Sequence, residues 1–80
     1  MDTRADDPGV GPVADLLGIR RVAMDGGRSR FDLSVRPDHM NPHGVVHGGI
    51  VYTLVDYAMG GALTSRLAPW ERCATLEVKI

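Results

Sequence analysis

Residues 41–67, NPHGVVHGGIVYTLVDYAMGGALTSRL, decide the fold of this chain. They begin with a loop broken by Pro42 and Gly44 and continue from His47 into a long apolar segment. Apolar residues recur in that segment at spacings of three and four, which predicts a helix of about twenty residues, roughly 30 Å long. Because this helix is apolar on most of its sides, we expect it to be central, with the rest of the chain packed around it.

Asp56 is the one acid in this apolar helix. An ionised carboxylate is seldom buried without a partner, so its position needs a structural or a chemical reason. Both interpretations stay open, because a neighbouring hydroxyl or a second subunit could satisfy the carboxylate as well as a reacting water could. Gly60 shares the face of Asp56 and leaves room for a ligand or another backbone to approach.

His47, Gly48 and Gly49 lie where the loop becomes the helix. The first N–H groups of a helix have no intrahelical acceptor, so this turn could hold an oxyanion. The other interpretation is that two glycines only permit a tight turn or close packing. Asp56 is roughly 13 Å from this turn along the helix axis, so one chain cannot easily direct both groups at one atom. A symmetric dimer could bring Asp56 of one copy to the turn of the other.

Three histidines, His39, His43 and His47, recur every four residues. On a helix this spacing would align three metal ligands. Pro42 and Gly44 lie among them and break a helix, so we predict loop histidines and no metal site.

Residues 73–80, CATLEVKI, alternate in polarity and predict a strand with Leu76 and Val78 on one face. Thr75 would lie on the opposite face and could hold a water molecule. The alternative is an ordinary strand threonine exposed to solvent. Cys73 has no base beside it in the sequence, which argues against a nucleophilic thiol.

The N-terminal half predicts a short helix and a hairpin. Residues 12–19 begin with proline and end near Gly18, as a helix does. Residues 20–24 and 28–35 are strand-like, and residues 25–27, Asp-Gly-Gly, suit the turn between them. Three strands are too few to enclose the long helix, so further strands or other chains are expected to supply its cover.

The composition limits the class of protein. A chain of 80 residues forms at most one domain and buries only about 60 to 65% of its unfolded surface, so a partner subunit is expected. One cysteine excludes an internal disulfide, and a net charge of −1 with scattered basic residues argues against nucleic acid as a partner. Residues 1–11 are acidic and are expected to form a disordered leader. We expect a soluble, cytoplasmic protein that does not enter the membrane.

The pattern N-x-x-G-x-x-H-G-G followed by an acid resembles the signature of hotdog-fold acyl-CoA thioesterases. The similarity is to the phenylacetate-degradation type within the 4-hydroxybenzoyl-CoA thioesterase superfamily. It extends over residues 12–80, including LLGI before the hairpin and ATLEVKI at the end. The residues at the spacing of the family signature are Asn41, Gly44, His47, Gly48, Gly49 and Asp56.

This resemblance implies an α+β hotdog fold, in which an antiparallel sheet wraps around the long helix and two protomers form composite sites. Family members continue with further strands, so residues 12–80 are expected to be the N-terminal part of a single domain that is truncated at its C-terminus. The assembly would be a homodimer or a dimer of dimers.

The resemblance also implies roles for single residues. The N–H of Gly48 would polarise the thioester carbonyl, with Gly49 beside it in the substrate-binding turn. Asn41 and His47 would orient substrate and water. Asp56 would reach across from the other protomer as general base or nucleophile.

A hydroxyl near Thr75 would help to position the attacking water. The implied substrate is an acyl-CoA, and no cofactor is implied. The alternatives are an acyl-CoA-binding module without turnover and an inactive fragment, whereas the motif of a hotdog dehydratase is not found.

Overall fold

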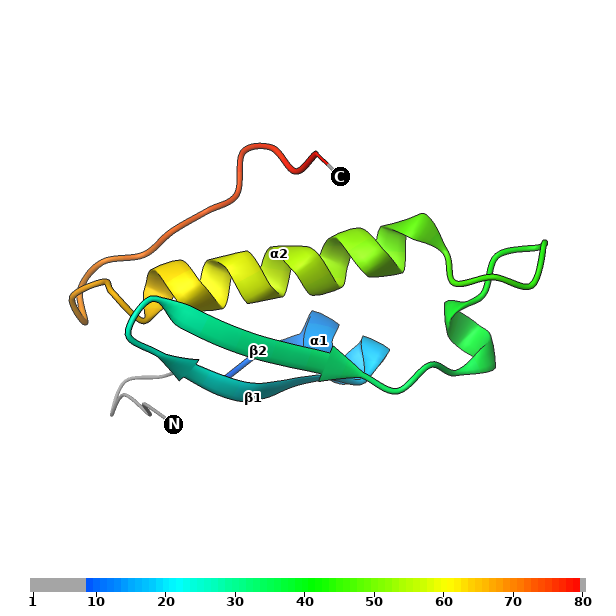
Figure 1. Cartoon of the computed structure of the whole chain (residues 1–80), viewed down its shortest axis with the longest axis horizontal. Helices are drawn as coiled ribbons and strands as arrows, with labels where there is room; N and C mark the ends of the chain where they lie inside the picture. Colours follow the sequence, from blue (N-terminus) through cyan, green and yellow to red (C-terminus); the bar gives the residue numbers. More distant parts are fainter. Residues whose placement is uncertain (1–8, 80) are drawn as a thin grey trace.

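The computed structural model describes residues 9–79. It is an α+β structure with a two-stranded antiparallel sheet and one long helix (Figure 1). The elements are, in chain order, α1 (Pro12–Leu17), β1 (Ile19–Asp25), β2 (Arg28–Leu33), the 3₁₀ helix η1 (Pro37–His39) and α2 (Gly48–Thr64). The first eight residues of the predicted leader, residues 1–11, lie outside the described part of the chain, as does residue 80.

The predicted hairpin is confirmed. β1 and β2 pair antiparallel, and Asp25 faces Arg28 across the two-residue turn. Gly26 and Gly27 form that turn with φ angles of 60° and 85°, a left-handed conformation that residues with a side chain rarely adopt. The register shifts between Arg21 and Ala23, so β1 carries one extra residue and bends at that point. β2 ends at Leu33, two residues earlier than predicted.

The predicted long helix is also confirmed, at 17 residues, or about 25 Å. It packs against the hairpin, mainly against β2. The closest approach is at Gly61, where an added Cβ atom would lie 2.6 Å from Cε1 of Phe31. The ring of Phe31 stacks on that of Tyr57, with centroids 5.9 Å apart. The hydroxyl of Ser29 donates to the backbone oxygen of Ala58.

The end of α2 is tied to the hairpin turn. The N–H of Gly27 donates to the hydroxyl of Ser65 over 2.7 Å. The guanidinium of Arg66 donates to the backbone oxygen of Gly26 over 3.1 Å. The hairpin is therefore held to α2 by packing along β2 and by hydrogen bonds at the turn.

Among the described residues the core is small and is formed by side chains of α1 and β1. Its buried apolar residues are Ala14, Ile19 and Met24. α1 ends at Leu17, two residues before the predicted end, because Gly18 adopts a left-handed conformation and donates its N–H to the oxygen of Ala14.

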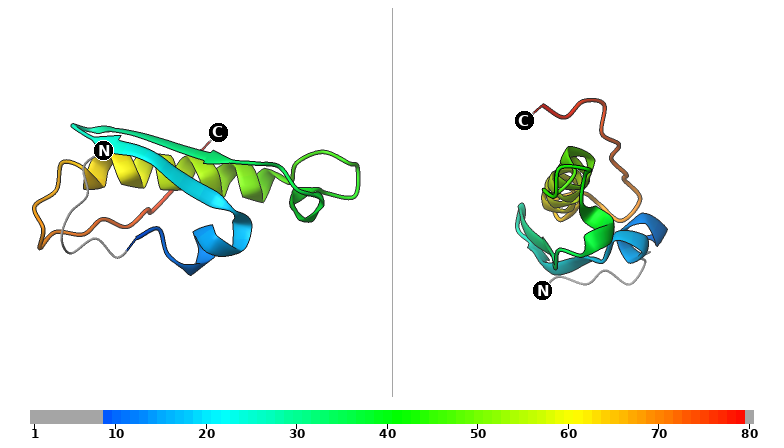
Figure 2. Two further views of the ribbon diagram at one scale, coloured as in Figure 1. Left: turned by 90° about the horizontal axis from the view of Figure 1, so that it is seen from below. Right: turned by 90° about the vertical axis from the view of Figure 1, so that its right-hand side faces the viewer.

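The predicted strand over residues 73–80 is wrong for the described residues 73–79, which form no strand. Figures 1 and 2 show this segment returning beside α2 without joining the sheet. β1 and β2 pair only with each other among the described residues. A strand needs a neighbouring backbone for its hydrogen bonds, so alternation alone cannot form one. Leu76, predicted to share one face of that strand with Val78, is 99% exposed.

The sheet covers one side of α2 instead of surrounding the helix (Figure 2). Tyr52, Met59 and Leu63 remain 42%, 46% and 51% exposed. Their spacing of seven and four residues places them on one face of the helix. Within residues 9–79, no helix is long and apolar enough to cross a membrane.

The two adjacent glycines of α2 give a matched test of this packing. At Gly60 an added Cβ atom would meet nothing within 4 Å, whereas at Gly61 it would meet the ring of Phe31. Both alanine variants gain the same helix propensity, so their difference isolates the contact. We expect Gly61→Ala to be less stable than Gly60→Ala by about 1 to 3 kcal/mol in urea unfolding of the intact protein. Equal stabilities would contradict the close approach.

Candidate functional site

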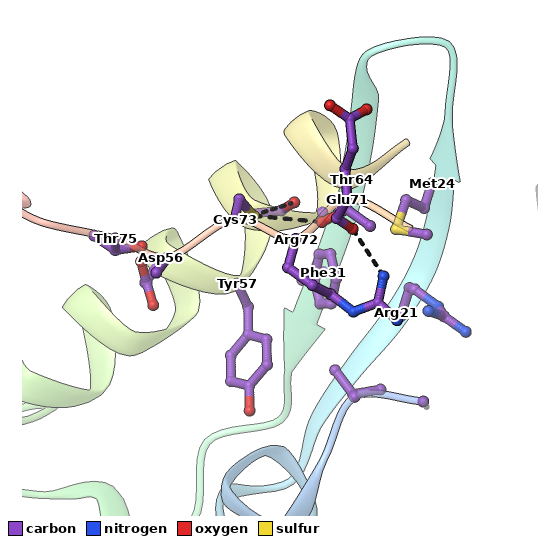
Figure 3. A pocket seen from close by; sticks show the side chains of 15 residues that line it. Arg21, Met24, Phe31, Asp56, Tyr57, Thr64, Glu71, Arg72, Cys73 and Thr75 are labelled. Carbon is purple, nitrogen blue, oxygen red and sulfur yellow. Dashed lines mark hydrogen bonds between the residues drawn. The ribbon is translucent and has the colours of Figure 1, made fainter. Parts of the chain in front are cut away.

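A cavity of about 510 Å³ lies between the hairpin, the second half of α2 and residues 71–75. Met24 and Phe31 of the strands supply apolar groups, and polar groups come from Arg21 of β1, from α2 and from the C-terminal segment (Figure 3). The labelled residues that line it are Arg21, Met24, Phe31, Asp56, Tyr57, Thr64, Glu71, Arg72, Cys73 and Thr75. A cleft of this size that combines apolar walls with a few polar groups is the usual form of a small-molecule site.

Asp56 borders this cavity with its carboxylate half-buried. Its Oδ1 accepts a hydrogen bond from the hydroxyl of Thr75, and Figure 3 shows the two side chains together. Its Oδ2 accepts no hydrogen bond from the described residues. Thr75 thus supplies a hydroxyl partner for the acid, and one carboxylate oxygen stays available to water or a substrate.

The N-terminal turn of α2 offers one available backbone donor. The N–H of Gly49 donates to Nδ1 of His47 over 2.8 Å, so His47 caps the helix with its side chain. The N–H of Gly48 has no acceptor among residues 9–79, and Gly48 is exposed. Because Nδ1 of His47 accepts, the proton of the neutral imidazole is on Nε2.

Asn41 shapes the loop that leads into this turn. Its side-chain oxygen accepts the N–H groups of His43 over 2.9 Å and of Val45 over 3.3 Å. A short bridge between Met40 and Val46 closes the loop. The amide of Asn41 is therefore engaged with the loop backbone, and it holds the loop that presents His47 and Gly48.

The structure divides the predicted site residues into two groups. Asn41, His47, Gly48 and Gly49 lie at the N-terminal end of α2, whereas Asp56 and Thr75 lie beside its middle. Eight residues of helix separate Gly48 from Asp56, about 12 Å along the axis. Within one chain the free donor of Gly48 and the carboxylate of Asp56 do not meet.

The three histidines have different environments. His39 is buried, while His43 and His47 are exposed. No group of three or more His, Cys, Asp or Glu side chains within residues 9–79 is arranged to hold a metal ion. The thiol of Cys73 is exposed and lies 3.6 Å from the hydroxyl of Thr64.

Sequence reasoning missed the hairpin side of the cavity. Arg21, Met24 and Phe31 line it from β1 and β2, and Tyr57 does so from α2. Nothing local in the sequence shows that these residues line one cavity with Asp56. Thr75 was identified from the sequence as a candidate site residue. Its hydrogen bond to Asp56, which is 19 residues away in the chain, was not predicted.

Fold and site together define a small α+β protein with a carboxylate and hydroxyl pair beside a cavity. No family model and no solved structure match the chain. The chain is similar to a protein of Archaeoglobus fulgidus named "Putative esterase", with 35% identity over 51 residues. That similarity covers 64% of this chain and 33% of the relative. The chain thus spans about a third of the length of the curated relative it matches.

Proposed function

We propose that the intact protein is a thioesterase that hydrolyses acyl-CoA to a free acid and CoA. The observation that carries this proposal is the pairing of Asp56 with Thr75 at the edge of a cavity, with the second carboxylate oxygen left unpaired by residues 9–79. A carboxylate in that state can accept a proton from water or attack a carbonyl carbon.

Two further observations support the hydrolase class and the thioester substrate. The similar protein of Archaeoglobus fulgidus carries the name of an esterase, and esterases are hydrolases. The proposal of an acyl-CoA thioester as substrate rests on residues 41–56. Their pattern of Asn41, His47, Gly48 and Asp56 resembles the signature of hotdog acyl-CoA thioesterases. The α+β arrangement of a hairpin packed along one long helix is compatible with part of a hotdog fold.

The proposed reaction uses one group from each of two copies. The N–H of Gly48 donates to the thioester oxygen and stabilises the negative charge that develops there. Asp56 of the second copy removes a proton from water while the water oxygen bonds to the carbonyl carbon. The C–S bond then breaks, the carboxylic acid forms, and the CoA thiolate takes up the proton. Direct attack by Asp56, followed by hydrolysis of the anhydride, is the variant of this route.

The proposed reaction requires self-association. Gly48 and Asp56 of one chain are about 12 Å apart along α2, so a common site needs a second copy. The exposed apolar face of Tyr52, Met59 and Leu63 supports such an assembly, because apolar surface of this kind is usually covered by a partner. A homodimer or a dimer of dimers satisfies this requirement.

Replacing the acid tests its chemical role. Asp56→Asn keeps an acceptor for Thr75 but cannot take up a proton at neutral pH. We expect kcat for a panel of acyl-CoA esters to fall by about 10² to 10⁴ in the intact protein. Asp25→Asn, at the exposed hairpin turn, is the matched control and should retain wild-type rates. Equal kcat in wild type and Asp56→Asn would remove Asp56 from the mechanism, and acyl-CoA binding without thiol release would favour a non-catalytic module.

Replacing Gly48 by proline tests the oxyanion donor. Proline lacks the N–H but is accepted at the first position of a helix. His47, with φ −60° and ψ 134°, already has the extended conformation that precedes proline. We expect Gly48→Pro to lower kcat by about 10² to 10³. Gly48→Ala keeps the N–H, and its added Cβ atom meets nothing within 4 Å, so it should retain most activity. Similar losses in both variants would argue against the backbone donor.

A further inference from the structure

We propose that His39 positions the N-terminal turn of α2, and through it the N–H of Gly48. His39 is 1% exposed and has the largest fully buried side chain among the described residues. It is not among the residues that line the cavity. The consequence for catalysis rests on the proposed function, whereas the consequence for the structure of the turn does not.

Both ring nitrogens of His39 are used. Nδ1 accepts the backbone N–H of Arg36 over 3.0 Å. Nε2 lies 2.8 Å from the backbone oxygen of Leu17. A carbonyl oxygen can only accept and a backbone N–H can only donate, so the ring is neutral with its proton on Nε2. In this form the buried imidazole leaves neither nitrogen without a partner.

These two bonds join elements that are distant in sequence. Leu17 is the last residue of α1, and Arg36 follows the end of β2. The guanidinium of Arg36 reinforces the joint by donating to the oxygen of Leu16 over 2.9 Å. The ring of His39 is therefore fixed relative to α1 and to the exit of the hairpin.

The backbone of His39 extends this joint to α2. Its carbonyl oxygen accepts the N–H of His47 over 2.8 Å, and His47 is the N-cap of α2. His39 ends the three-residue helix η1, and a single 3₁₀ turn has little stability of its own. When the ring of His39 is held in place, its carbonyl oxygen is held in place too, and so is His47, which donates to that oxygen. The direction of the N–H of Gly48, the next residue, therefore depends on the position of His39.

The tautomer is the first test and needs no activity. Long-range ¹H–¹⁵N spectra of the imidazoles in the intact protein should show His39 neutral, with its proton on Nε2. A His39 ring protonated on Nδ1 would overturn the inference, because it could not accept the N–H of Arg36.

Substitutions that keep one bond each are the second test. His39→Gln retains a donor that can reach Leu17, and His39→Asn retains an acceptor for Arg36. His39→Leu keeps the bulk and loses both bonds. We expect amide hydrogen exchange at His47 and Gly49, whose N–H groups are hydrogen-bonded in the wild type, to accelerate at least about tenfold in the leucine variant and less in the other two. His43→Leu, at the exposed histidine of the same loop, is the control and should exchange as wild type does.

Kinetics separate a positioning role from a merely structural one. A misdirected donor weakens transition-state binding more than substrate binding, so kcat should fall about tenfold in His39→Gln with KM within about twofold of wild type. A folded His39→Gln protein with wild-type kcat and wild-type exchange at His47 would overturn the inference. If wild type shows no thioester turnover but the exchange at His47 responds to the substitutions, the positioning stands and the proposed function fails.

Discussion

The close approach of α2 to β2 at Gly61 is the constraint on which the rest of the structure depends. With no side chain at this position, the helix backbone lies against the ring of Phe31, and that ring stacks on Tyr57. The same approach brings Ser29 within hydrogen-bonding range of the helix backbone. The position of the helix over the hairpin determines where Asp56 lies and gives the cavity two of its walls. The absence of a side chain at Gly61 therefore determines how closely α2 and β2 pack.

Local patterns in the sequence predicted the elements of the fold well. Gly26 and Gly27 predicted a turn because few other residues accept their backbone angles, and the spacing of apolar residues predicted α2. The same kind of local pattern gave a wrong prediction for residues 73–80. Its alternation is real, but a strand exists only when another backbone completes its hydrogen bonds, and none does so among the described residues. One face of α2 is exposed for a related reason: the two strands of the hairpin cover only one side of the helix.

The candidate site was predictable residue by residue but not as an arrangement. Asp56 stood out as an acid in an apolar helix, and Gly48 as the first donor of that helix. Their separation followed from helix geometry alone. The contact of Asp56 with Thr75 and the burial of His39 did not follow, because both depend on where distant segments meet. His39 lay in a pattern of three histidines that suggested only metal ligands or a loop, whereas the structure gives it two backbone partners from different elements.

The proposed mechanism requires that Asp56 of one copy serves the Gly48 turn of another. Mixing two inactive variants tests it most directly, because a hybrid of Asp56→Asn and Gly48→Pro chains contains one site with both defects and one site with neither. After the two proteins are unfolded together and refolded, we expect recovery to about a quarter of the wild-type rate, since half of the dimers are hybrids with one intact site each. Each variant refolded alone should stay inactive. A mixture as inactive as its components would contradict the claim, because both groups would then have to come from the same chain.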